Sequence, residues 1–361
     1  MRSALLTVAF LVALAGCGGD DEETAAPAAT TSTTQPATEA DLGQVKEFLL
    51  DHTAQLSDFT GRFQQLASRY SQLAENGFTP DERSEAASVL TDLKRVWTEG
   101  NPYYERVEGI VAGTPSLSEF DVIIDAGSSA SEDPESAVPF DLTLPDGKVL
   151  QQPGNLFNLT EGALWGTLPQ SLAGQVSGAP ADLDGDGRSS FGELLPHAGF
   201  LEASSGEFHR QAGALDQAAD AWQPTPSDAF TSLVVMVPTM SEYFGQWKES
   251  RFVRGSRFTS ESFNVVSRLS DIRDILSGLE VIYGGIEPLA VKADPAKSGQ
   301  VKRELTELKA YVEDIYAQER SGRRYTPEQA DSLGAEAQSR ATAIAGQVSQ
   351  LAGELSIPIE Q

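Results

Sequence analysis

Long stripes of apolar residues with the period of an α-helix are the feature that most constrains this fold. In the first stripe, spacings of four and three residues alternate over nine positions: Val45, Leu49, His52, Leu56, Phe59, Phe63, Leu66, Tyr70 and Leu73. This spacing puts all nine side chains on one face of a single long helix. Because such a face has to be buried against other elements, the stripe predicts a helical bundle.

Further helices are expected on both sides of the middle of the chain. Thr79-Pro80-Asp81-Glu82 is typical of a helix start, and Asn101-Pro102 is expected to interrupt or kink the helix that follows. The same alternation returns in three later stripes: Val265, Leu269, Ile272, Leu276, Leu279, Tyr283 and Ile286; Val301, Leu305, Leu308, Val312 and Ile315; Ile344, Val348, Leu351 and Leu355. We therefore predict an all-α fold with two helix-rich halves.

The Gly-, Pro- and Asp-rich stretch from about residue 113 to 206 separates these halves. One β signal lies within it: Phe140, Leu142 and Leu144 alternate, Pro145-Asp146-Gly147 can form a turn, and Val149-Leu150 follows. This pattern predicts a small hairpin.

The first residues are typical of an export signal. Arg2 precedes an apolar stretch from Ala4 to Ala15 that is too short to span a bilayer, and Leu14-Ala15-Gly16-Cys17 is a lipobox. We expect a signal peptide over 1–17, with Cys17 as the lipidated residue, and a disordered tether over 18–41. The protein would then be exported and held at the cell envelope by its lipid, with the membrane as a partner.

The charge is strongly negative, with 26 Lys and Arg against 53 Asp and Glu. A net charge of −27 excludes a nucleic-acid partner bound through its phosphates, because the two polyanions would repel each other. Between Val107 and Gly187 thirteen acidic residues accompany one basic residue, Lys148. This stretch is either a solvated acidic surface or in part a binding site for metal cations.

A twelve-residue segment within it has the spacing of a calcium loop. The predicted ligands are Asp182, Asp184, Asp186, the Arg188 carbonyl, Ser190 and Glu193, with Gly187 at the sharp turn. Ser189 stands where a branched apolar residue is usual, and Val176 to Pro180 make a poor incoming helix. We therefore expect a lone structural calcium loop; the alternative is an Asp/Gly-rich turn without metal.

Three stretches of the chain are similar to segments of one known protein family. Residues 104–110 are Tyr-Glu-Arg-Val-Glu-Gly-Ile and are similar to a Tyr-Glu-Arg-Ile-Glu-x-Ile segment of that family. Residues 155–166 are similar to its Gly-Phe-His-x-x-Glu-x-x-Leu-Trp motif, and residues 248–279 show a weaker similarity to its second-half helix. In these stretches the chain resembles the imelysin-like proteins, in particular the EfeO/EfeM-type lipoproteins of bacterial iron uptake. The resemblance implies two up-and-down four-helix bundles, with a metal site between helices and a role in iron uptake or other metal handling.

The chain departs from the family at the motif itself. Asn158 stands where the motif has its His, whereas Glu161 is retained. In the second half, Phe258-Thr259-Ser260-Glu261-Ser262-Phe263 replaces the family's Tyr-Ser-His-x-Asp-Leu, so a second His and an acid are missing. The iron or copper site that the resemblance implies is then altered or lost.

The residues themselves allow a replacement site for a cation. Glu105 and Glu108 share one helix face, as do Asn158 and Glu161, and three carboxylates with an amide oxygen suit a hard cation such as iron(III) or another divalent or trivalent ion. Alternatively, Glu108 and Glu161 are solvated or paired with Arg106. His52, on the first apolar stripe, is either a tentative ligand or a core histidine.

Two classes of function remain. The first is a metal-binding envelope lipoprotein that serves a metal-uptake system; the second is a calcium-stabilised surface interaction module that has lost the transition metal. We do not expect an enzyme, because neither His197 nor His209 belongs to a His-Glu-x-x-His site. The expected units after the tether are a first bundle with the hairpin (42–170), an acidic connection with the calcium loop (171–206) and a second bundle (207–361).

Overall fold

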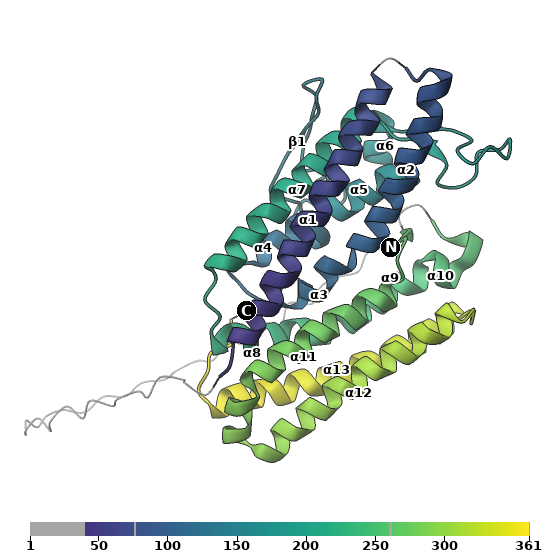
Figure 1. Cartoon of the computed structure of the whole chain (residues 1–361). Helices are drawn as coiled ribbons and strands as arrows, with labels where there is room; N and C mark the ends of the chain where they lie inside the picture. Colours follow the sequence, from purple (N-terminus) through teal and green to yellow (C-terminus); the bar gives the residue numbers. More distant parts are fainter. Residues whose placement is uncertain (1–39, 76, 260–261, 361) are drawn as a thin grey trace, which may run out of the picture. The chain divides into compact units, whose positions relative to one another are not determined.

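A computed structural model describes residues 40–360 apart from 76 and 260–261. The predictions for 1–39, including the signal peptide, Cys17 and most of the tether, lie outside the described residues, as do Ser260 and Glu261. Figure 1 shows two groups of helices that run in different directions. The first group consists of α1 (Gly43–Ala74), α2 (Pro80–Gly100), α3 (Pro102–Val111), α5 (Leu156–Trp165) and α7 (Ala198–Ala221).

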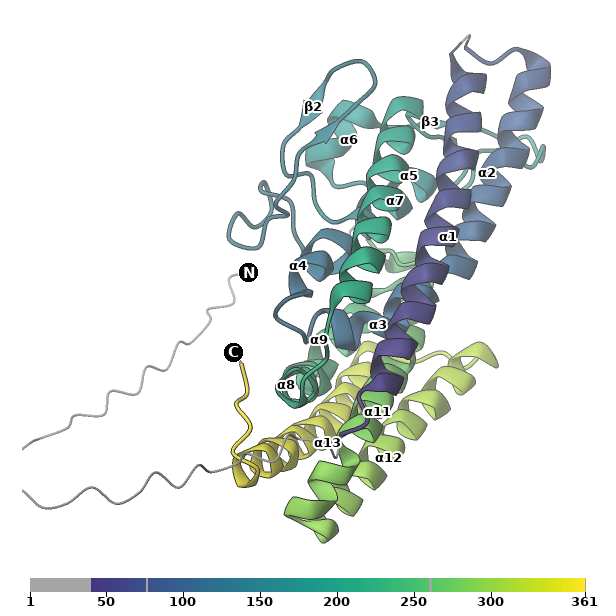
Figure 2. The same cartoon turned by 60° about the vertical axis from the view of Figure 1, so that its left-hand side comes forward.

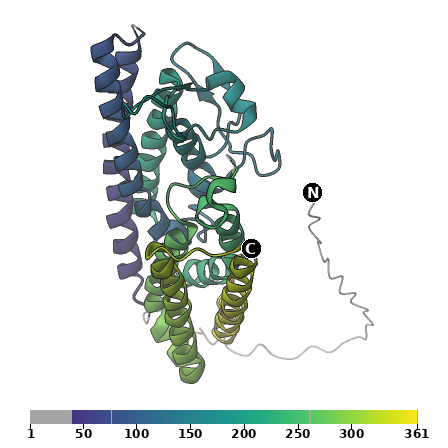
Figure 3. The same ribbon diagram turned by 90° about the vertical axis from the view of Figure 1, so that its right-hand side faces the viewer.

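The first apolar stripe forms the interior face of α1. Seven of its nine side chains are buried, and His52 and Leu66 are half-buried. This face packs along α7 and α2, which lie beside α1 in all three views (Figures 1, 2 and 3). The helix start predicted at residues 79–82 is a capping box between Thr79 and Glu82. Pro102 separates α2 from α3, at the expected break or kink.

The second group contains the three later stripes, apart from Val265, which precedes its helix, and Leu355, which directly follows its helix. It consists of α8 (Pro226–Met236), α9 (Met240–Glu249), α10 (Arg251–Arg254), α11 (Arg268–Ala293), α12 (Pro295–Arg320) and α13 (Pro327–Glu354), with short 3-10 turns at Val237–Thr239 and Gly255–Arg257. α11 packs on α12, and α13 packs on α9 and α12. Among the described residues, no helix is long and apolar enough to cross a membrane.

The middle of the chain is mostly irregular. α4 (Ser118–Asp121) continues as a π-helical turn over Val122–Ala126, and α6 (Gln170–Val176) follows α5. The predicted hairpin is present: β1 (Leu142–Thr143) pairs antiparallel with β2 (Val149–Leu150) around a turn in which Gly147 has a φ of 86°. A second antiparallel pair joins β3 (Ala179–Pro180) to β4 (Leu194–Leu195). The all-α fold with a small hairpin is thus confirmed.

One helix crosses the expected boundary between the halves. α7 runs from 198 to 221 and packs along α1, so the first group of helices extends beyond residue 207. The two groups also meet directly, because α3 packs against both α1 and α11. Gly109 and Gly278 allow this close approach: a Cβ at Gly278 would lie 2.4 Å from the Arg106 carbonyl oxygen. The contact between α3 and α11 carries the acidic residues described next.

Candidate metal centre

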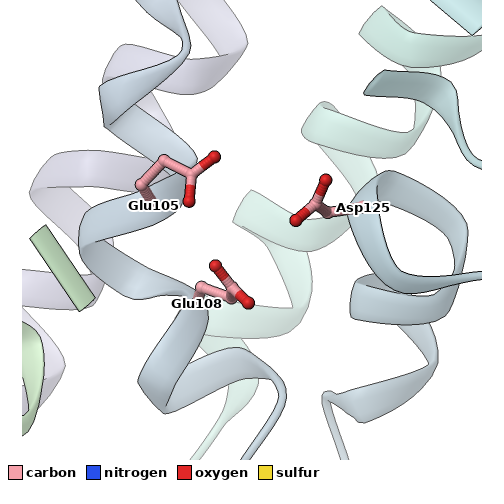
Figure 4. A group of neighbouring side chains, drawn as sticks. All are labelled: Glu105, Glu108 and Asp125. Atoms are coloured by element: carbon pink, nitrogen blue, oxygen red, sulfur yellow. The ribbon is translucent and has the colours of Figure 1, made fainter. Parts of the chain in front are cut away.

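Three carboxylates meet beside the contact between α3 and α11. Glu105 and Glu108 are three residues apart on α3 and so share one of its faces, and Asp125 projects from the π-helical turn (Figure 4). One oxygen of each lies within 4.8 Å of the others. Oxygen ligands that each lie about 2.0–2.6 Å from one cation are commonly close enough together to fall within this limit.

Two of these carboxylates have an oxygen without a protein partner. Glu105 is fully buried and Glu108 is 3% exposed, yet within the described part of the chain no hydrogen bond reaches Oε2 of either. Their Oε1 atoms accept hydrogen bonds, from the Asn101 side-chain amide at 3.0 Å and from the Tyr243 hydroxyl. A buried carboxylate oxygen with no donor is costly, so this arrangement fits residues that gain a partner when a cation binds.

Further acidic groups surround the three carboxylates. Asp121 accepts a hydrogen bond of 2.6 Å from Tyr104, and Asp271 pairs with Arg268 at 3.0 Å. Arg268 is 13% exposed in its side chain. Although burial alone would lower its pKa, Asp125, Asp271 and Glu105 hold the pKa of Arg268 well above its usual value. The single guanidinium of Arg268 therefore faces several carboxylates, and these carboxylates outnumber the positive charge beside them.

The carboxyl pKa values reflect this imbalance. Burial, and then repulsion from Asp271 and Glu108, raises the pKa of Glu105 well above its usual range. Burial and the nearby Asp125 and Asp121 do the same to the pKa of Glu108. Burial also raises the pKa values of Asp121 and Asp271 to about 7, against hydrogen bonding and ion pairing that lower them. Without a cation, burial and mutual repulsion therefore disfavour the charged forms of these carboxyl groups.

A cavity of about 710 Å³ opens beside two of the three carboxylates, those of Glu108 and Asp125. Its walls come from both groups of helices and include Glu108, Asp125, Asn158, Glu161, Tyr243 and Arg268. Among the described residues, Arg268 is the only basic one that lines it. A neighbouring space of about 20 Å³, the size of one water or ion, shares Asp125, Asn158, Glu161 and Arg268 with it. The arrangement suits entry and binding of a cation.

The structure brings only some of the predicted family-like ligands together. Glu105 and Glu108 belong to the carboxylate group, whereas Asn158 is exposed on α5 and lines the cavity. Both oxygens of Glu161 are already engaged: Oε2 accepts from the Trp97 indole and Oε1 from the Val265 backbone, each at 2.9 Å. Burial raises the pKa of Glu161 to about 7.

The alternative interpretations of these residues have different outcomes. Glu108 is 3% exposed and lines the cavity, and within the described part of the chain no ion pair joins Glu108 or Glu161 to Arg106. His52 does not belong to the carboxylate group. Its Nδ1 lies 2.8 Å from the Phe48 carbonyl oxygen, and its ring centroid lies 4.3 Å from that of Phe48. His52 is therefore a half-buried residue that packs against Phe48 within α1.

Several residues of this site do not stand out in the sequence. Asp121 and Asp125 belong there only to the general acidic stretch, and no pattern marks Tyr243, Arg268 or Asp271. Asp121 and Asp125 do flank the apolar run Val122 to Ile124, which is itself expected to be buried. That signal could have marked both as candidates; the other three are brought near only by the packing of α9 and α11.

The predicted calcium loop adopts a tight, acid-lined turn. Asp182 accepts hydrogen bonds from the backbone N–H groups of Gly185 and Gly187, and Glu193 accepts from Ser190 at 2.6 Å. One carboxylate oxygen each of Asp182, Asp184 and Glu193 lies within 4.8 Å of the others. Gly187 has a φ of 84°, as the sharp turn requires. The short strands β3 and β4 flank the loop in place of helices.

Together, two packed groups of helices and a buried cluster of carboxylates at their contact define a class of all-α proteins with an acidic site between helices. The family model for imelysin, also named peptidase M75, matches residues 62–351. The chain therefore belongs to the imelysin family. A search of curated proteins gave no significant match. Because the family also carries the name of a peptidase, our expectation that this chain is not an enzyme stays a prediction.

Proposed function

We propose that this imelysin-family protein is an envelope-anchored lipoprotein of the EfeO/EfeM type that binds a hard metal cation for an uptake system. The cation is held by Glu105, Glu108 and Asp125. The observation that carries the proposal is the pair of buried Oε2 atoms of Glu105 and Glu108, which have no hydrogen-bond partner among the residues that the structure describes. Family membership supports the link to metal handling.

The choice of a hard cation follows from the donor atoms. Carboxylate oxygens bind iron(III), calcium, magnesium and manganese, whereas copper and zinc favour imidazole and thiolate ligands. The three carboxylates supply three negative charges, and Asn158, in place of the motif's His, offers at most an amide oxygen at the cavity wall. The site therefore favours a trivalent or divalent oxygen-seeking ion over copper.

We also propose that the loop at 182–193 binds calcium as a separate structural ion. Asp182, Asp184, Asp186, the Arg188 carbonyl, Ser190 and Glu193 are the ligands. The spacing of acids, glycine and final Glu supports this assignment, as does the approach of three of the carboxylates. Strand-flanked loops have no helix pair to open, so calcium here acts on stability and does not act as a switch.

A second candidate function keeps the calcium loop but not the interior site. In that case the chain is a calcium-stabilised surface interaction module, and the loss of the motif's His at Asn158 is the observation that favours it. Elemental analysis of the purified full chain separates the two candidates. Stoichiometric iron or another ion that persists in the Asp182→Ala, Glu193→Ala variant supports the first candidate; calcium alone, lost in that variant, supports the second.

A further inference from the structure

Tyr243 connects the second group of helices to the carboxylates of the first. It lies on α9, is 8% exposed, and lines the large cavity together with Glu108 and Asp125. Its hydroxyl donates a hydrogen bond to Oε1 of Glu108. The other oxygen of Glu108, Oε2, is buried and accepts no hydrogen bond from the described residues. One oxygen of this carboxylate is thus held, and the other is left for a ligand.

A carboxylate at the end of a glutamate side chain rotates unless its surroundings fix it. Glu108 has one strong donor, Tyr243, and among the described residues no basic side chain forms an ion pair with it. The hydroxyl therefore sets the plane of the carboxylate and the direction of its free oxygen. Residues that hold metal ligands in this way commonly change affinity by about 10–100-fold when they are mutated.

We propose that Tyr243 is a positioning residue of the cation site: its hydroxyl holds Glu108 so that the free Oε2 faces the ion. This inference rests on the proposed function, because it assumes that Glu105, Glu108 and Asp125 bind a cation. It adds that the site is completed across the two groups of helices. The ligands come from α3 and the π-helical turn, and the group that orients one of them comes from α9.

The matching control is another buried tyrosine of the second group. Tyr283 on α11 is 2% exposed and donates a hydrogen bond of 2.8 Å to the Ser298 carbonyl oxygen, within the packing of α11 on α12. Replacing either tyrosine by Phe keeps the ring and removes one buried hydroxyl. The two variants therefore impose similar structural changes, but Tyr243→Phe alone removes a donor to a proposed ligand.

Manganese(II) titration of the full chain tests the proposal. In every sample, Asp182→Ala and Glu193→Ala remove ion binding by the loop at 182–193. Manganese binding is followed by calorimetry and by the electron paramagnetic resonance of free manganese. We expect Tyr243→Phe to weaken interior binding about 10–100-fold and Tyr283→Phe to change it less than about threefold. Equal affinity in Tyr243→Phe and the parent would overturn the inference. No interior binding in the parent would overturn the proposed function itself.

A double-mutant cycle shows whether Tyr243 acts through Glu108. Glu108→Gln lowers affinity by removing a ligand charge, and adding Tyr243→Phe to it should lower affinity no further. A further loss equal to that seen in the parent would mean that Tyr243 acts independently of Glu108, and would contradict the positioning role. After loading with iron(III), a visible phenolate-to-iron band that disappears in Tyr243→Phe would also contradict it, because it would make Tyr243 a direct ligand.

Discussion

Glu161 on α5 accepts a hydrogen bond of 2.9 Å from the backbone N–H of Val265, just before α11. This bond joins α5 to the chain segment that leads into Arg268 and Asp271. The other carboxylate oxygen of Glu161 accepts a hydrogen bond from the indole N–H of Trp97 on α2. Glu161 therefore connects α5 to α2 and to the segment before α11, and in the function that we propose the cation is bound by Glu105, Glu108 and Asp125.

The buried carboxylates should make the cation-free protein less stable than a neutral variant. Glu108→Gln removes a like charge from the neighbourhood of Glu105 and Asp125, so we expect the melting temperature in chelator to rise by a few degrees. Cation affinity should fall at least about tenfold, since a ligand charge is lost. Differential scanning calorimetry with and without manganese(II) checks both effects, and a variant that is less stable without metal would contradict the picture of an uncompensated acid cluster.

The stability of the cation-free protein should fall as pH rises. Asp121, Glu161 and Asp271 have pKa values raised to about 7, above the values of about 4 expected in the unfolded chain. A carboxyl whose pKa is raised on folding stabilises the fold fully below its unfolded pKa, and this contribution is lost as pH passes through the folded pKa. The melting temperature in chelator should therefore be lower at about pH 8 than at about pH 5.5. A saturating cation should reduce this difference.

Calcium should raise the melting temperature of the full chain, because an ion that binds only the folded loop stabilises it by mass action. Asp182→Ala with Glu193→Ala should remove this gain. The exposed acids Glu119 and Glu135 provide a control pair from the same acidic stretch, and their replacement by Ala should leave the gain intact. An unchanged melting temperature on adding calcium to the parent chain would show that the turn forms without metal.

Restoring the family's motif should change which ion the site prefers. Asn158 is exposed and lines the cavity, so Asn158→His can be accommodated without repacking the core. An imidazole there should raise the affinity for copper(II) or zinc relative to manganese(II). Competition titrations measure this ratio. If the ratio does not change, the imidazole does not reach the ion, and position 158 is not part of this site.

The helices followed from the sequence because burial of a periodic apolar face is a local signal. Val45 to Leu73 and Leu269 to Ile286 lie where the stripes placed them. The sequence did not indicate that α7 runs across the boundary expected at residues 206–207. The packing of α7 on α1 depends on contacts between distant parts of the chain. For the site, Glu105 and Glu108 could be inferred from their spacing on one helix. Tyr243, Arg268 and Asp271 could not, since only the packing of α9 and α11 brings them to α3.

The number of ions bound by the interior carboxylates tests the proposed metal site most directly. Full-length protein carrying Asp182→Ala and Glu193→Ala is loaded with iron(III) or manganese(II), freed of excess metal and analysed by mass spectrometry of the elements. We predict retention of bound metal at stoichiometric level, and loss of that metal when Glu105→Gln and Glu108→Gln are added. Retention of the same amount of metal by that variant, or none by its parent, would contradict the interior site.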